Sequence, residues 1–163
     1  MGGVSSPNTL KMVTKYAHTN LIAKNWKRLV KFYQEVFGCT PVPPERDLSG
    51  NWLDEATGLT GSHIRGIHLR LPGYGDDGPT LELFQYDEMP DRPAVAPNTP
   101  GFSHIAFAVD DVRGVAENVI AHGGSAVGQI TVRDVKDVGV LTFQYLLDPE
   151  GNIIEVQNWR TKS

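Results

Sequence analysis

The sequence lacks several features that would assign a protein to common functional classes. It has one cysteine, Cys39, among 163 residues, so it cannot form an internal disulfide. It has 15 basic against 19 acidic residues, which leaves no positive charge excess for binding nucleic acid or an anionic membrane surface. No stretch approaches the roughly 20 apolar residues that span a bilayer. We therefore expect a cytoplasmic protein with no nucleic-acid partner and no membrane partner.

What the sequence does contain is a faint internal duplication. Residues 16–22 and 103–109 have the pattern of strands, and each is followed by a helical pattern that ends at a glycine. Each copy then closes with an apolar strand that carries one glutamate, Glu82 in the first copy and Glu155 in the second. A carboxylate in an apolar strand is costly to bury unless a partner compensates it. The repetition indicates that this partner is shared between the copies.

The two copies predict the same order of elements, a strand, a helix and then several antiparallel strands. In the first copy we expect a strand at 15–23, a helix capped by Asn25 and ended by Gly38, an irregular segment at 40–62 with a short helical turn at 53–58, and strands at 64–71 and 80–86. In the second copy we expect a strand at 103–109, a helix capped by Asp111 and ended at 123–124, and strands near 126–132, 139–147 and 152–158.

These elements divide the chain into two βαβββ modules. We expect a flexible leader at 1–14, module 1 at 15–86, a proline-rich linker at 87–101, module 2 at 102–159 and a tail at 160–163. One sheet with one helix leaves its second face open, so the two modules should pack together. The sequence therefore predicts an α+β fold built from paired modules.

Each copy also carries one strand histidine at a matched position, His18 or His104. The two histidines are 86 residues apart and the two glutamates are 73 apart, so the four residues occupy equivalent places in the two copies. Two imidazoles and two carboxylates suit a divalent first-row metal such as Ni, Co, Zn, Mn or Fe. Four protein ligands in an octahedral shell leave two positions for water or substrate, which favours catalysis. His63, His68 and His122 have no matched partners, so we do not expect them to be ligands.

Five segments carry a resemblance to a known family: 18–21, 32–38, 81–83, 103–111 and 148–155. Through them the chain resembles the vicinal oxygen chelate superfamily. This superfamily includes glyoxalase I, methylmalonyl-CoA epimerase, extradiol dioxygenases, and fosfomycin- and bleomycin-resistance proteins. The resemblance implies that the paired modules form a cupped mixed sheet around a metal site. It also implies that His18, Glu82, His104 and Glu155 are the metal ligands.

The order of these ligands, His, Glu, His, Glu, is similar to that of bacterial-type glyoxalase I. Methylmalonyl-CoA epimerases usually have Gln at the position of Glu82, and dioxygenases typically use two histidines and one glutamate. The resemblance therefore implies a lactoylglutathione lyase-like metalloenzyme that transfers a proton through a metal-bound enediolate of a small carbonyl or thiol-adduct substrate. In this scheme Glu155 is the catalytic base, Glu82 lies opposite it, and the histidines are plain ligands.

Three alternatives remain open. An acyl-CoA epimerase would draw its base from outside the metal shell, with Glu45 or Glu55 as candidates. A dioxygenase would require redox-active iron, and a non-catalytic resistance protein would only bind a small molecule. We expect a homodimer, in which the two modules pair either within one chain or across the dimer interface. Trp52, Phe84 and Tyr145 are aromatic residues that could line an apolar substrate pocket.

Overall fold

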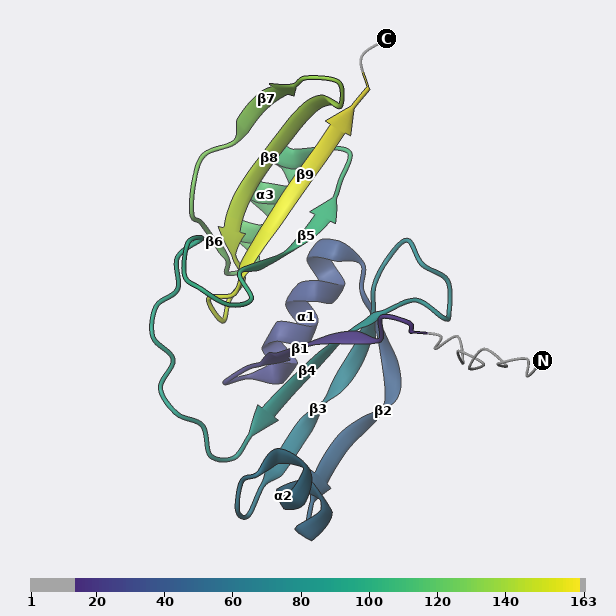
Figure 1. Cartoon of the computed structure of the whole chain (residues 1–163), viewed down its shortest axis with the longest axis vertical. Helices are drawn as coiled ribbons and strands as arrows, with labels where there is room; N and C mark the ends of the chain where they lie inside the picture. The colour runs from purple at the N-terminus through teal and green to yellow at the C-terminus, as the bar shows by residue number, and fades with distance from the viewer. Residues whose placement is uncertain (1–13, 162–163) are drawn as a thin grey trace, which may run out of the picture.

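The computed structural model describes residues 14–161, which form two mixed sheets and three helices. The first part comprises β1 (His18–Ile22), α1 (Trp26–Phe37), β2 (Thr40–Ser49), α2 (Asn51–Thr57), β3 (His63–Arg70) and β4 (Thr80–Tyr86). Its strands lie in the order β1-β4-β3-β2, with β1 parallel to β4 and the other pairs antiparallel (Figure 1). We call this four-stranded sheet the first sheet.

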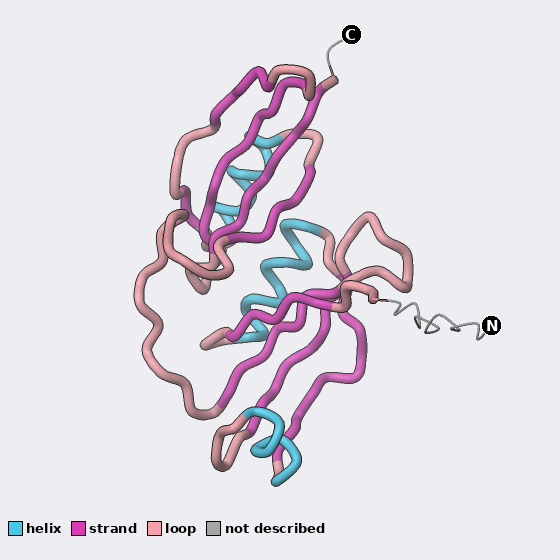
Figure 2. The backbone as a smooth tube through the Cα atoms, in the orientation of Figure 1, coloured by secondary structure: helices cyan, strands magenta, loops and turns pink. Residues whose placement is uncertain are grey.

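The second part repeats the plan. It comprises β5 (His104–Ala108), α3 (Val112–Ala121), β6 (Ser125–Ala126), β7 (Thr131–Val135), β8 (Gly139–Leu147) and β9 (Ile153–Arg160). The strand order is β5-β9-β8-β6, β7 also pairs with β8, and β5 runs parallel to β9. This five-stranded sheet is the second sheet. The predicted α+β fold class is confirmed, and the segment at 87–101 between the two parts is a long loop without helix or strand (Figure 2).

The helices begin and end where local chemistry favours it. The Asn25 side chain accepts a hydrogen bond from the backbone N–H of Arg28 at 3.0 Å, and Gly38 closes α1 in the left-handed conformation at φ 69°. Asp111 caps α3 in the same way through the N–H of Gly114. Both α1 and α3 bury an apolar face against their own sheet. Within residues 14–161 the opposite face of the second sheet has no helix, whereas part of the opposite face of the first sheet is covered by α2, whose Leu53 packs against Ile64 and Phe84.

The two modules share one hydrophobic core, in which α1 lies against α3 and against the first sheet (Figure 1). The rings of Phe37 and Phe107 stack across the junction with their centroids 4.0 Å apart. The buried hydroxyl of Tyr33 in α1 donates a hydrogen bond to the Asp148 carboxylate in the β8–β9 turn at 2.8 Å. One core therefore holds both copies of the repeat together.

The prediction that 40–62 is irregular is wrong for its first half. Residues 40–49 form β2, which pairs with β3 at the edge of the first sheet, and only α2 matches the expected short helical turn. Prolines hid the strand in the sequence, since they cannot donate ladder hydrogen bonds. An edge strand tolerates them, and Pro43 and Pro44 lie in an interruption of the β2–β3 pairing.

The remaining predictions concern one strand of the second sheet, the two chain ends and membrane spans. The strand expected near 126–132 is split into β6 and β7. The leader at 1–14 falls almost entirely outside the described residues, as does half of the tail at 160–163. None of the helices within 14–161 is long and apolar enough to cross a membrane.

Candidate metal centre

The strand register places one histidine and one glutamate at the same relative position in each sheet. In the first sheet His18 is paired with Thr80, and Glu82 lies two residues further along β4. In the second sheet His104 is paired with Ile153, and Glu155 lies two residues further along β9. Side chains two residues apart on a strand point to the same face. Each histidine therefore shares a sheet face with its glutamate, and this face is opposite α1 in the first sheet and opposite α3 in the second.

In the first sheet a second histidine joins this pair. His68 on β3 is paired across the strands with Glu82, and its Nε2 lies 2.8 Å from Glu82 Oε2. His18 Nε2 lies 3.8 Å from Glu82 Oε1. One ligand atom from each of the three residues lies within 4.8 Å of the other two. We call His18, His68 and Glu82 the first half-site.

Two further contacts orient the first half-site. Asn20, two residues after His18 on β1, donates its side-chain N–H to Glu82 Oε1 at 2.8 Å. His68 Nδ1 lies 3.0 Å from Thr80 Oγ1, so the hydroxyl holds one edge of the ring. Contacts of this kind set ring orientation and carboxylate position in metal sites.

Electrostatics favour the neutral form of His68. Burial lowers the pKa of His68 most strongly, the Glu82 charge opposes this, and the charges of Arg46 and His18 lower the pKa further. The net pKa lies below the ordinary value of about 6.5, so the imidazole is neutral near pH 7. Neutral imidazole is the form that binds metal ions.

The second half-site consists of His104 and Glu155. His104 Nε2 lies 3.0 Å from Glu155 Oε2. The cross-strand neighbour of Glu155 on β8 is Tyr145, whose ring centroid lies 5.0 Å from that of His104. Tyr145 thus occupies in the second sheet the place that His68 occupies in the first.

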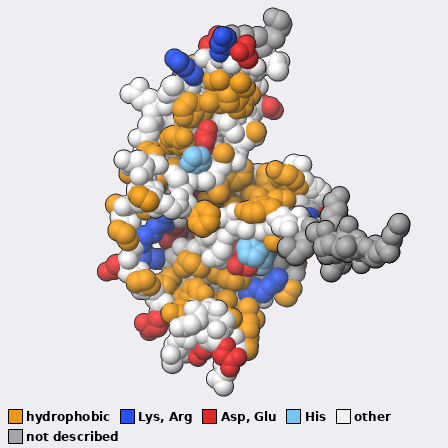
Figure 3. Space-filling view, viewed as in Figure 1, with side chains coloured by type: hydrophobic (Ala, Val, Ile, Leu, Met, Phe, Trp, Pro, Cys, Tyr) orange, Lys and Arg blue, Asp and Glu red, His pale blue; other side chains and the backbone are white. Residues whose placement is uncertain are grey.

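The structure brings the four predicted ligands together only in pairs. Among residues 14–161, one group of three or more potential ligand residues has its ligand atoms within 4.8 Å of one another, and that group is the first half-site. His104 and Glu155 do not belong to it. In Figure 3 histidine surface is visible in two separate places on one side of the molecule, one over each module, with acidic surface beside each. In a single chain, therefore, the four residues form two half-sites.

His68 is the residue that sequence reasoning missed, since it has no histidine counterpart in the other copy. A signal for it was present in the β3–β4 hairpin. His68 and Glu82 each lie seven residues from Gly75, so symmetric pairing about the loop places them opposite each other.

Of the other residues singled out from the sequence, Phe84 lies beside the first half-site, with its ring centroid 6.1 Å from that of His68. Phe84 is buried in a small core beneath α2, and the exposed Trp52 donates its indole N–H to the Ser49 carbonyl. Glu45 on β2 and Glu55 on α2 are exposed, and neither belongs to the first half-site.

The two remaining histidines also lie apart from the half-sites. His63 Nδ1 contacts Asp87 at 2.7 Å and its Nε2 contacts Asp47 at 2.6 Å. His122 ends α3, where its Nδ1 lies 2.8 Å from the Asn118 carbonyl oxygen.

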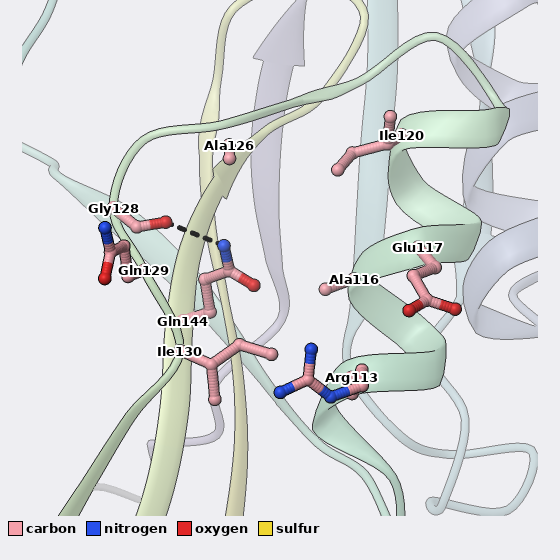
Figure 4. Close-up of a pocket in the computed structure, with 9 residues that line it drawn as sticks. All are labelled: Arg113, Ala116, Glu117, Ile120, Ala126, Gly128, Gln129, Ile130 and Gln144. Atoms are coloured by element: carbon pink, nitrogen blue, oxygen red, sulfur yellow. Dashed lines mark hydrogen bonds between the residues drawn. The ribbon is translucent and has the colours of Figure 1, made fainter.

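A cleft of about 440 Å³ lies in module 2, between α3 and the helix-facing side of the second sheet (Figure 4). Arg113 and Glu117 project from α3, and Gln144 donates a hydrogen bond from β8 to the Gly128 carbonyl at 2.7 Å. Gln144 and Tyr145 are adjacent in β8 and point to opposite faces. The cleft is therefore separated from the second half-site by the sheet.

The donor set of the half-sites fits a divalent transition metal. Imidazole nitrogen and carboxylate oxygen are ligands that Zn, Co, Ni, Fe and Mn accept. Donors at about 2.1 Å from an ion, at right angles, lie about 3 Å apart. The distances of 2.8 Å and 3.8 Å to Glu82 require only small side-chain movements to reach that geometry.

Comparisons with known proteins agree with this architecture. The model of the family described as Glyoxalase/Bleomycin resistance protein/Dioxygenase superfamily matches residues 15–156. A glyoxalase family protein from Bacillus cereus is 16% identical with a TM-score of 0.78, covering 93% of this chain and 97% of its own. No curated protein matches the chain.

Two further solved structures share the fold. A glyoxalase I mutant from Zea mays is 20% identical with a TM-score of 0.60, and the match covers 87% of this chain and 45% of the maize chain. A genomically encoded fosfomycin resistance protein from Listeria monocytogenes, complexed with Mn(II) and sulfate, is 15% identical with a TM-score of 0.53, covering 91% and 95%. At these identities the likeness establishes the fold alone.

Proposed function

Because this chain belongs to the Glyoxalase/Bleomycin resistance protein/Dioxygenase superfamily, we propose that it is a divalent-metal enzyme of glyoxalase I type. One observation carries the proposal. The His18–Glu82 pair and the His104–Glu155 pair occupy the same register positions in two sheets of one duplicated plan. Matched placement of the same two donor types in both copies is the pattern expected of ligands to one shared ion.

We propose that a second copy of the chain completes the metal centre. Each half-site presents its donors on the sheet face that α1 or α3 does not cover, and within one chain the two pairs lie apart. Apolar side chains share those faces: Ile22 on β1 is 41% exposed and Trp159 on β9 is 44% exposed. A homodimer that lays the second sheet of one copy over the first sheet of its partner would bury these side chains and join the half-sites.

The bound divalent ion would supply a Lewis acid that stabilises negative charge on the oxygens of an enediolate. The residues of the chain would move the proton. Glu155 removes a carbon-bound proton next to a carbonyl group and returns it to the neighbouring carbon. Glu82 is held by Asn20 on one oxygen and by His68 on the other, which supports the assignment of Glu155 as the base.

The substrate class that this chemistry serves is a small carbonyl compound or its thiol adduct, such as a hemithioacetal. A proton next to a carbonyl is acidic enough for a carboxylate base once the developing charge is stabilised. The buried free thiol of Cys39 supports a location in the reducing cytoplasm.

The test combines metal content with proton exchange. The purified protein is analysed for bound metal and incubated in D₂O with a hemithioacetal formed from a 2-oxoaldehyde and a thiol. His18→Ala should lose metal and activity together. Glu155→Gln should lower turnover by about 10²-fold or more, the usual contribution of a general base. His122→Ala, a histidine at the end of α3, is the control and should retain both.

Two results would count against the proposal. Stoichiometric metal in His18→Ala would show that the shared centre is wrong. Normal metal content in wild-type protein without conversion of the hemithioacetal would show that the site binds metal for another purpose.

A further inference from the structure

We infer that His68 is a metal ligand, so that module 1 alone holds a divalent first-row transition metal ion through His18, His68 and Glu82. The inference rests on the proposed function for the roles of His18 and Glu82. It adds a third donor from the same chain, and it predicts that a single chain loads metal before a second copy contributes.

The first argument is distance. His68 Nε2 lies 2.8 Å from Glu82 Oε2, which is closer than the 3.8 Å between His18 Nε2 and the other oxygen of the same carboxylate. A separation near 3 Å is what two donors of one ion require when they sit at right angles. The sequence pattern predicts His18 as a ligand. By distance to Glu82, His68 is at least as well placed for this role.

The second argument is the environment of the ring. Ligating histidines bind metal through one nitrogen and donate the other N–H to a fixed oxygen. His68 has this arrangement, because its Nδ1 lies 3.0 Å from Thr80 Oγ1 while its Nε2 faces the carboxylate. Asn20 holds Glu82 from the other side at 2.8 Å. Both donors are thus oriented by a neighbouring side chain.

The third argument is the difference between the two half-sites. Both glutamates have a cross-strand neighbour on the same face, but it is His68 for Glu82 and Tyr145 for Glu155. A neutral phenol is a poor replacement for imidazole as a donor to these ions. The first half-site therefore has three good donors and the second half-site has two.

This difference changes the expected coordination in the dimer. Three donors from one chain and two from its partner occupy five positions of an octahedral shell, which leaves one for substrate. The four-ligand arrangement would leave two. The first half-site would hold the ion, and the second half-site of the partner would bring the base Glu155 to the substrate.

The experiment counts histidine ligands directly. The full-length protein is loaded with Co²⁺, and paramagnetic proton NMR records the exchangeable N–H signals of metal-bound imidazoles. We expect three such signals per site, one of which disappears in His68→Ala. The affinity for Co²⁺, measured by titration calorimetry, should fall about tenfold to 100-fold or more in this variant. His63→Ala, on the same strand but outside the half-site, should leave signals and affinity unchanged.

Two further variants separate ligation from orientation and from dimer effects. His68→Gln retains a hydrogen-bond donor for Glu82 but no imidazole, so it should not restore Co²⁺ affinity if His68 is a ligand. The double variant His104→Ala/Glu155→Gln removes both donors of the second half-site. It should still bind one Co²⁺ per chain and show the two signals of the first half-site.

The outcomes distinguish this inference from the proposed function. Two imidazole signals in the wild type, unaffected by His68→Ala, would overturn the inference and leave the four-ligand centre standing. Full rescue by His68→Gln would assign His68 an orienting role and also overturn it. Loss of all Co²⁺ binding in the double variant would overturn loading by a single chain. Stoichiometric Co²⁺ binding in His18→Ala would refute the proposed function itself.

Discussion

Replacing Tyr33 by Phe removes one oxygen atom from the contact between the two modules. Tyr33 is fully buried and Asp148 is only 3% exposed, so their 2.8 Å hydrogen bond lies out of water. Burial raises the pKa of Tyr33 well above its ordinary value, which keeps the hydroxyl protonated as a donor. The variant leaves the apolar surface of the ring in place and removes only the donor.

The magnitude follows from what the carboxylate keeps. A hydrogen bond to a charged group contributes about 1.5–3 kcal/mol. In the variant Asp148 retains the Asn152 side chain and the backbone N–H groups of Glu150 and Asn152 as donors. It is therefore not left without partners, and we expect a loss in unfolding free energy of about 2 kcal/mol rather than a larger penalty.

The assay is urea unfolding of the metal-free protein, since a bound ion would shift the equilibrium by mass action. Tyr74→Phe, in the exposed β3–β4 loop, is the matched control and should change the unfolding free energy by less than about 0.5 kcal/mol. If Tyr33→Phe is as stable as this control, the hydrogen bond contributes nothing and apolar packing alone holds the modules together.

Three other substitutions test individual contacts of the fold. A Cβ at Gly66 would collide with the Leu83 carbonyl oxygen and the Phe84 ring. Gly66→Ala should therefore lower the free energy of unfolding by about 1–3 kcal/mol. An unfolding free energy equal to that of the wild type would contradict the β3–β4 register. The Glu150 carboxylate accepts two backbone N–H groups just before α1, at 2.9 and 3.0 Å, and Glu150→Ala should cost about 1 kcal/mol by thermal unfolding. Contacts with Asp47 and Asp87 raise the pKa of His63 in the folded protein. Protonated His63 should therefore make its full contribution to the free energy of unfolding below pH about 6.5, and this contribution should be lost as pH rises through the higher folded-state pKa. In His63→Gln the free energy of unfolding should no longer fall over this pH range. A profile like that of the wild type would show that the contacts of His63 with the two aspartates do not stabilise the fold.

The features that the sequence by itself determined are those that depend on neighbours along the chain. Asn25 and Gly38 bound α1 because a cap and a left-handed stop act on residues within one turn. The matched histidines and glutamates were visible because duplication preserves spacing within each copy. The fold class followed from the repeated order of elements, since a strand, a helix and further strands can bury their apolar faces in few ways.

Contacts between distant segments were decided only by the tertiary structure. The β2 strand exists because β3 offers it an edge, which outweighs its unfavourable prolines. His68 meets Glu82 because the β3–β4 register brings them to one face. The separation of the two half-sites follows from the packing of α1 against α3, which joins the modules through their helices and leaves the half-sites on the other face of each sheet. The repeat in the sequence places one histidine and one glutamate in each copy, but the free energy of packing between the modules decides which of these side chains lie together.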